Sequence, residues 1–263
     1  LLTRSYNDDN FMTVAEFIEA GENPARIDEL LSFNVFEAAK NSDDIDESAD
    51  EGEIVLESID ETDEGGLKNP YGSAYDWRLI LANKQNPLPE DHEIKLAGIS
   101  GGLKVDERIL APLKRMFAAA KADGVDLYVC SAYRSHDRQT TLFNNKIKRY
   151  TAQGMTYLDA YTLASFSVTV PGTSEHELGL ALDIVTPEYT ELTEGFEDTD
   201  AGRWLKENAG DYGFILRYPK GKSNITGIIY EPGHYRYVGE EAAKQIMDND
   251  LSLEEYLIEI GIR

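Results

Sequence analysis

Short links between apolar segments constrain the fold of this chain more than any other feature. Apolar runs at 125–133, 178–185 and 214–218 are typical of strands. Several links between the expected strands are too short for the crossover helix that a parallel strand pair requires. The sequence therefore predicts an α+β fold, with a small antiparallel sheet flanked by helices, and disfavours a doubly wound parallel sheet.

Periodic apolar spacing predicts the helices around this sheet. A capping serine, Ser135, marks the start of one helix, and Gly124 marks the end of another. We expect helices over 106–124, 135–150, 156–167, 201–213, 240–250 and 252–261. We also expect a strand over 77–83 and an extended, proline-interrupted segment over 227–238.

The first 66 residues differ in composition from the rest of the 263-residue chain. They hold 20 acidic and 3 basic residues, which gives −17 of the total net charge of −24. Helical spacing over 13–40 is followed by an acidic, linker-like segment with one short expected strand over 53–59. We therefore expect an acidic N-terminal extension over 1–68, with short helices and a flexible linker, and a folded domain over 69–263.

Composition also excludes several classes of protein. A net charge of −24 disfavours the basic face that phosphate contacts need, so we expect no nucleic-acid partner. No run of about 18 apolar residues is present, so we expect no transmembrane segment. The first residues do not match a signal peptide, which predicts a cytoplasmic protein or a secreted one without its leader. The single cysteine, Cys130, excludes an internal disulfide, and its apolar neighbours predict a buried small residue.

A histidine lies just before the strand expected over 178–185, which carries an aspartate. Alternation places Asp183 on the face opposite the leucines, and Gly179 allows the chain to turn so that His176 can point towards it. A histidine beside an aspartate is commonly a structural hydrogen-bonded pair, and it can also supply two metal ligands. The spacing alone leaves both interpretations open.

The segment 231–234 supplies another histidine with a nearby carboxylate. With His176 and Asp183, His234 would form a ligand set typical of catalytic zinc, in which the fourth position stays open for water. Glu231, which this set does not need as a ligand, could then take the proton of that water.

A third polar element follows the strand expected over 125–133, a usual place for site residues. Arg134 offers a planar guanidinium suited to a carboxylate or an oxyanion, and a structural ion pair is the alternative. Gln139 could add an amide contact from the first helical turns. The remaining histidines, His92 and His136, are expected to be surface or capping residues.

Four motifs occur in order within residues 69–250: SAYRSHDRQ, PGTSEHELGLALDIV, NAGDYGFILRYPKGK and YEPGHYRYVG. Together they resemble the VanY-type D-alanyl-D-alanine carboxypeptidases and the related L,D-carboxypeptidases, which are zinc peptidases of bacterial peptidoglycan. The most specific pattern consists of Ser174, His176, Gly179, Ala181 and Asp183. The resemblance implies the small α+β zinc-peptidase fold that is shared with hedgehog signalling domains.

The resemblance also implies roles for individual residues. Glu231 would be the catalytic base, and Arg134 would steady the scissile carbonyl or the terminal carboxylate. One zinc ion per chain would be bound by three residues, which are His176, Asp183 and His234. Three further residues would contact the substrate, which are Gln139, Ser174 and Tyr218.

The implied reaction is zinc-dependent removal of the terminal D-alanine from a peptidoglycan stem peptide. Three alternatives stay open: an L,D-carboxypeptidase, an endopeptidase of the same fold, and a non-catalytic zinc-containing module that binds the cell wall. We expect a monomer that works outside the cytoplasm, either secreted or attached to the cell envelope.

One position departs from the family pattern, which usually has tryptophan where this chain has Gly233. If space is open there, we expect Gly233→Trp to raise stability and turnover, because the indole would stiffen the segment and limit water at the site. If neighbouring loops already fill the space, tryptophan would overpack it.

Overall fold

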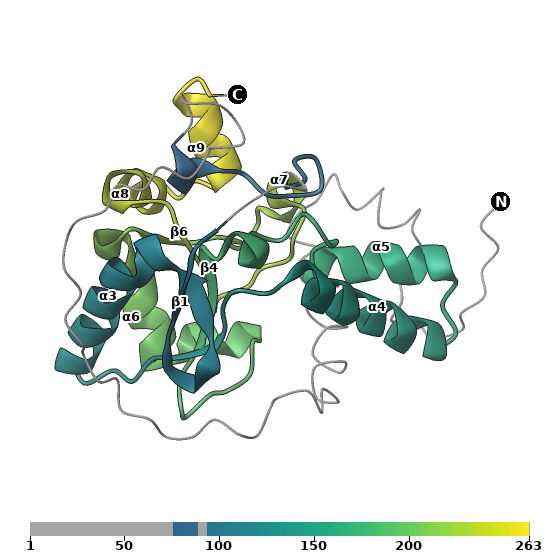
Figure 1. The fold of residues 1–263 in the computed structure, drawn as a ribbon, viewed down its shortest axis with the longest axis horizontal. Coiled ribbons are helices and arrows are strands. Elements are labelled where there is room, and N and C mark those ends of the chain that lie inside the picture. The colour runs from purple at the N-terminus through teal and green to yellow at the C-terminus, as the bar shows by residue number, and fades with distance from the viewer. Residues whose placement is uncertain (1–75, 89–93, 263) are drawn as a thin grey trace.

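A four-stranded antiparallel sheet lies at the centre of the structure, a computed structural model that describes residues 76–88 and 94–262 (Figure 1). Its strand order is β3-β4-β6-β5, and each neighbouring pair is antiparallel, which confirms the predicted sheet type. The strands are β3 (Tyr128–Ser131), β4 (Ala181–Val185), β6 (His234–Tyr237) and β5 (Phe214–Leu216). A separate antiparallel pair joins β1 (Leu96–Gly98) to β2 (Lys104–Asp106).

The six helices expected within the described residues are all present; α4 ends two residues later than expected, and the other five are shorter than expected. The α-helices are α3 (Leu110–Ala122), α4 (His136–Ala152), α5 (Tyr157–Ser167), α6 (Asp200–Asn208), α7 (Ser223–Thr226), α8 (Glu240–Asp248) and α9 (Leu253–Glu259). The 3₁₀ helices are η1 (Trp77–Leu79), η2 (Ser100–Gly102), η3 (Glu107–Ile109), η4 (Glu175–Leu178), η5 (Glu194–Asp198) and η6 (Ala209–Tyr212). The predicted cap is confirmed, because the Ser135 hydroxyl accepts a hydrogen bond from the Arg138 N–H at the start of α4.

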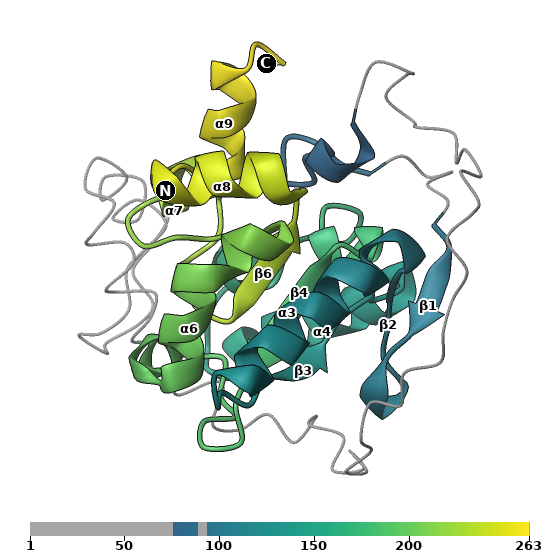
Figure 2. The same cartoon turned by 90° about the vertical axis from the view of Figure 1, so that its left-hand side faces the viewer.

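The main core lies between one face of the sheet and helices α3 and α6, which stand in front of the strands in Figure 2. Leu182 of β4 and Tyr235 of β6 are fully buried in this core, and Met116 and Leu205 meet them from the two helices. Burial of these apolar side chains is the main force that holds the helices on the sheet.

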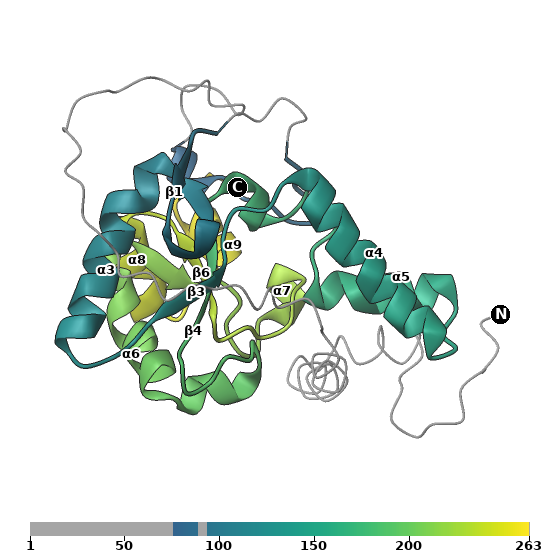
Figure 3. The same ribbon diagram turned by 60° about the horizontal axis from the view of Figure 1, so that its bottom comes forward.

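Helices α4 and α5 form a pair that extends away from the sheet (Figures 1 and 3). They pack on each other through a small apolar cluster of their own, with Phe143, Ile147 and Tyr150 facing Ala160 and Ala164. No helix within 76–88 and 94–262 is both long enough and apolar enough to cross a membrane.

Two local predictions were wrong. The segment over 77–83 is not a strand but begins as η1, because the Asp76 carboxylate caps it by accepting from the Arg78 N–H. Cys130 is exposed instead of buried, because β3 is an edge strand with one face towards solvent. The extended segment over 227–238 becomes a regular strand only in β6.

Several predictions fall outside the described residues. These are the helices over 13–40, the strand over 53–59, the boundary between 68 and 69, and the surface position of His92.

Candidate metal centre

Two of the predicted ligands face each other across the central strands. Asp183 of β4 is paired directly with His234 of β6, just beyond the pair formed by Leu182 and Tyr235. Directly opposed residues share a face of the sheet, and successive residues alternate between faces. The leucine and tyrosine therefore enter the core under α3 and α6, while Asp183 and His234 lie together on the opposite face.

The third predicted ligand comes from the turn before β4. His176 lies in η4, which ends at Gly179 with a φ of +69°. A side chain would be strained there, and its Cβ would lie 2.9 Å from the backbone nitrogen of Asp106. This glycine turn directs the chain into β4 and leaves His176 Nε2 3.3 Å from Asp183 Oδ2.

The three side chains form a group that fits a metal ion. One possible ligand atom from each residue lies within 4.8 Å of the others, and all three residues are buried. His176 Nδ1 must carry a proton, because it lies 2.6 Å from the carbonyl oxygen of Ala132, which only accepts. His176 Nε2 is therefore left with its lone pair, and it is buried with no hydrogen-bond partner in the part of the chain that the structure describes. This outer hydrogen bond is the kind that orients metal-binding histidines.

The electrostatics of the group suit a cation. Burial opposes ionisation of Asp183, but the two neighbouring histidines hold its pKa well below the usual range. Burial, together with the charge of Arg134, lowers the pKa of His176 to about 4. An ionised carboxylate and a neutral imidazole are the forms in which these side chains bind metals. Two nitrogen donors and one oxygen donor form a set typical of catalytic zinc sites.

The predicted base lies beside this group. Glu231 Oε2 is 3.6 Å from His234 Nδ1, and its side chain is 25% exposed. A tight turn holds it there, because the His234 N–H donates to the Glu231 carbonyl and the Glu231 N–H donates to the Tyr218 carbonyl. Burial raises the pKa of Glu231 to about 7, close to the pH at which a general base works best.

Arg134 and Tyr218 also reach the group. Arg134 Nη2 lies 3.4 Å from Asp183 Oδ2, and the Arg134 N–H donates to the His176 carbonyl. The Tyr218 ring lies 4.7 Å from the His234 ring, measured between centroids. The structure thus brings six of the eight predicted residues together, and their roles remain predictions.

The other two predicted residues have less direct links to the group. Gln139 is fully buried on α4, and its amide donates to the carbonyl oxygen of Thr169, while its own Oε1 has no partner among the described residues. Ser174 is buried immediately before η4. A substrate contact by either residue remains a prediction.

The space beside Gly233 is already filled. A Cβ at this position would lie 2.7 Å from the Ile184 carbonyl oxygen and 3.2 Å from Leu192 Cδ2. These distances contradict the premise of open space and favour the second expectation, that tryptophan would overpack the site.

Two buried charged residues near the site were not predicted from the sequence. Lys146 is buried on α4, seven residues after Gln139, and it lies close enough for its charge to influence Glu231. Glu175, the residue before His176, is also fully buried and pairs with arginines distant in sequence. The seven-residue helical spacing could have indicated Lys146, but no local pattern indicates the partners of Glu175.

The chain matches one protein family over the part that carries this group. The matching family model is described as VanY: D-alanyl-D-alanine carboxypeptidase, and it covers residues 102–240. A D-alanyl-D-alanine carboxypeptidase of Enterococcus faecalis (strain ATCC 700802 / V583) is 45% identical over 188 residues, which are 71% of this chain and 68% of that protein.

Two solved structures are similar in sequence and in fold. One is a mutant of the vancomycin-resistance D,D-pentapeptidase VanY in complex with Zn(II), which is 46% identical with a TM-score of 0.64 over 69% of this chain and 99% of that chain. The other is the LD-carboxypeptidase LdcB, at 41% identity and a TM-score of 0.58 over 68% of this chain and 84% of that chain. The family match over residues 102–240 includes the segments that carry the histidine–aspartate group, and the chain therefore belongs to the VanY family of D-alanyl-D-alanine carboxypeptidases.

Proposed function

We propose that this chain is a zinc-dependent carboxypeptidase that removes the terminal D-alanine from peptidoglycan stem peptides. The observation that carries the proposal is the buried group of His176, Asp183 and His234, with a carboxylate of raised pKa at its edge. A related VanY structure is a complex with Zn(II), and a related protein is named D-alanyl-D-alanine carboxypeptidase.

Glu231 and Arg134 have different roles in the proposed hydrolysis. When bound, a zinc ion polarises the scissile carbonyl and lowers the pKa of water at the site. Glu231 takes the proton of the attacking water and passes it to the leaving amine, and a pKa near neutrality suits both steps. Arg134, whose guanidinium lies 3.4 Å from the Asp183 carboxylate, is close enough to the group to offset charge on the developing oxyanion.

The proposed substrate indicates the location of the activity, and the origin of the site residues bears on the oligomeric state. Peptidoglycan lies outside the cytoplasmic membrane, so the proposed activity is extracytoplasmic. The three proposed ligands and the proposed base all come from one chain, so a monomer is sufficient for the reaction.

The test is mass spectrometry of stem peptides after incubation with the zinc-loaded protein. A pentapeptide ending in D-Ala-D-Ala should lose one alanine, whereas the corresponding tetrapeptide should stay intact. Loss of alanine from the tetrapeptide alone would assign the L,D specificity of the LdcB relative instead. Cleavage within a longer cross-linked peptide would indicate an endopeptidase.

A matched control separates catalysis from contamination. The zinc-loaded Glu231→Gln variant keeps the size and shape of the side chain but cannot accept the proton. It should leave both peptides intact. If the unaltered protein leaves every peptide intact as well while carrying zinc, the chain is a binding module.

A further inference from the structure

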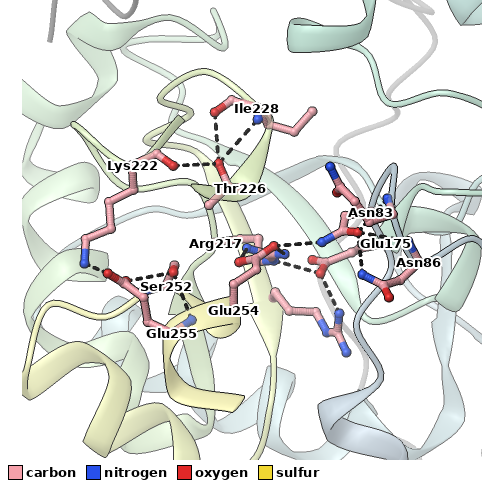
Figure 4. A network of polar contacts seen from close by, with 12 residues as sticks. Asn83, Asn86, Glu175, Arg217, Lys222, Thr226, Ile228, Ser252, Glu254 and Glu255 are labelled. Carbon is pink, nitrogen blue, oxygen red and sulfur yellow. Dashed lines mark hydrogen bonds and ion pairs between the residues drawn. The ribbon is translucent and has the colours of Figure 1, made fainter. Parts of the chain in front are cut away.

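A network of buried ion pairs connects Glu175 to Arg217 and Glu254 (Figure 4). Glu175 Oε1 lies 2.7 Å from Arg217 Nε and 2.8 Å from Arg236 Nη1. The side chains of all three residues are 0% exposed. Burying three charges is costly unless they are paired, so this arrangement requires each partner to stay in place.

Each of these three charged residues lies one or two positions along the chain from a residue of the proposed site. Glu175 immediately precedes His176 in η4. Arg236 lies two residues after His234 in β6, and Arg217 immediately precedes Tyr218. The Arg217 N–H also donates to the His234 carbonyl at 3.2 Å. One carboxylate therefore ties together three segments that are far apart in sequence and that each carry a site residue.

The network extends from Arg217 to helix α9. Glu254 of α9 accepts two hydrogen bonds from Arg217, at 2.8 Å from Nη1 and 2.7 Å from Nη2. The Asn83 amide donates to the same carboxylate at 3.1 Å. Both Glu254 and Asn83 lie outside residues 102–240, which are the part that matches the family model. The two arginines and two glutamates balance in charge.

We propose that Glu175 is a positioning residue for the metal centre, and that Glu254 extends this control to α9. Arg236 and Arg217 hold the Glu175 carboxylate, and this fixes η4 relative to β6. The fixed segments keep the ring of His176 at its 4.9 Å centroid distance from the ring of His234. The proposal rests on the proposed zinc function, since it concerns how the metal ligands are held.

The first test is the zinc dissociation constant, measured by competition with a chromophoric chelator. Glu175→Gln keeps the shape of the side chain and removes its charge, and it should weaken zinc binding by about 10–100-fold, as typical for residues that orient metal ligands. Glu254→Gln should weaken binding in the same direction by a smaller factor. Glu259→Gln is the matched control, because Glu259 lies at the exposed end of the same helix. It should leave zinc affinity unchanged.

The second test needs no metal. The rings of His176 and His234 are close enough to give a nuclear Overhauser effect between them in metal-free protein. Glu175→Gln should weaken this signal relative to the unaltered chain, whereas Glu259→Gln should not. A purely structural network would lower the melting temperature and move neither readout.

The outcomes separate the two proposals. Unaltered zinc affinity and ring proximity in folded Glu175→Gln overturn the positioning role. If that variant does not fold, the comparison of Glu254→Gln with Glu259→Gln decides, and equal zinc affinities overturn the positioning role. If the unaltered protein binds no zinc, the proposed function fails, and the metal-free ring signal still tests the positioning role.

Discussion

Asp183 Oδ1 lies 2.9 Å from His234 Nδ1 at a directly paired position of β4 and β6. The separation of these two proposed ligands is therefore set by backbone hydrogen bonds of the sheet and not by a loop. Sites built on regular elements hold their geometry more closely than sites on loops. The third proposed ligand, His176, depends on the turn at Gly179 and on the contacts of its neighbour Glu175.

The first prediction concerns metal content. Elemental analysis should find one zinc per chain, and Asp183→Asn should lose most of it, because an amide is neutral and binds zinc far more weakly than a carboxylate. His136→Ala is the control, since this histidine is largely exposed and pairs with Glu177 instead of the metal group. Absence of zinc from the unaltered protein, even after zinc is added, would contradict the assignment.

The second prediction concerns the base. Glu231→Gln should keep its zinc and lose turnover by about 10²–10⁴-fold, the usual contribution of general-base assistance. Steady-state rates and metal content should be measured on the same sample. A variant that loses its metal would show that Glu231 is a ligand instead of a base.

The third prediction concerns Gly233. Because a Cβ there would lie 2.7 Å from the Ile184 carbonyl oxygen, Gly233→Trp should lower the free energy of unfolding by about 1–3 kcal/mol. Adding Leu192→Ala should recover part of this loss by clearing the second contact. Urea unfolding of the three proteins measures both effects. A single variant more stable than the parent would mean that the loops move aside.

The fourth prediction concerns pH. Burial lowers the pKa of Lys84 and of Lys146 to about 8, whereas both titrate near 10.5 when the chain is unfolded. The unfolded chain then binds more protons than the folded chain above about pH 8, so the free energy of unfolding should rise with pH in this window. Lys146→Met should reduce that slope by up to about 1.4 kcal/mol per pH unit.

Urea unfolding between about pH 8 and pH 9.5 measures this slope, below the range in which tyrosines ionise in the unfolded chain. Lys148→Met, an exposed position on the same helix, is the control and should keep the parental slope. An identical slope in the two variants would mean that Lys146 has an anionic or solvated environment after folding.

The fifth prediction concerns the domain boundary. A chain shortened to residues 69–263 should fold with an unchanged melting temperature and hydrolyse peptide normally, because the acidic, linker-like composition of the first 66 residues is typical of a spacer. Thermal unfolding of the full and shortened chains tests this. A large drop in melting temperature would show that the helices expected over 13–40 pack on the domain.

The sequence predicted the parts of the fold that have a local pattern. The periodicity of α4 and its Ser135 cap, like the alternation around Asp183, depend on neighbours within a few residues. The 77–83 segment was misassigned because its apolar side chains suit a strand, while the cap from Asp76 favours a 3₁₀ turn.

The candidate site was only partly predictable for a similar reason. Motif spacing indicated the histidines and the aspartate, but Glu175 and Arg217 meet across 42 positions of the chain, so no periodic pattern relates them. The space beside Gly233 depends likewise on Leu192, which a separate loop brings into contact. Such contacts follow from the tertiary fold as a whole.

The bidentate pair of Arg217 and Glu254 has a consequence for how the protein is made. The two residues are 37 positions apart, so a ribosome that adds about 5–20 residues per second supplies the glutamate about 2–7 s after the arginine. Without Glu254, the single carboxylate of Glu175 would face two buried arginines, and one positive charge would lack a counter-charge at a cost of about 3–5 kcal/mol. We therefore expect the end of the sheet that carries Arg217 to close only after α9 has been synthesised.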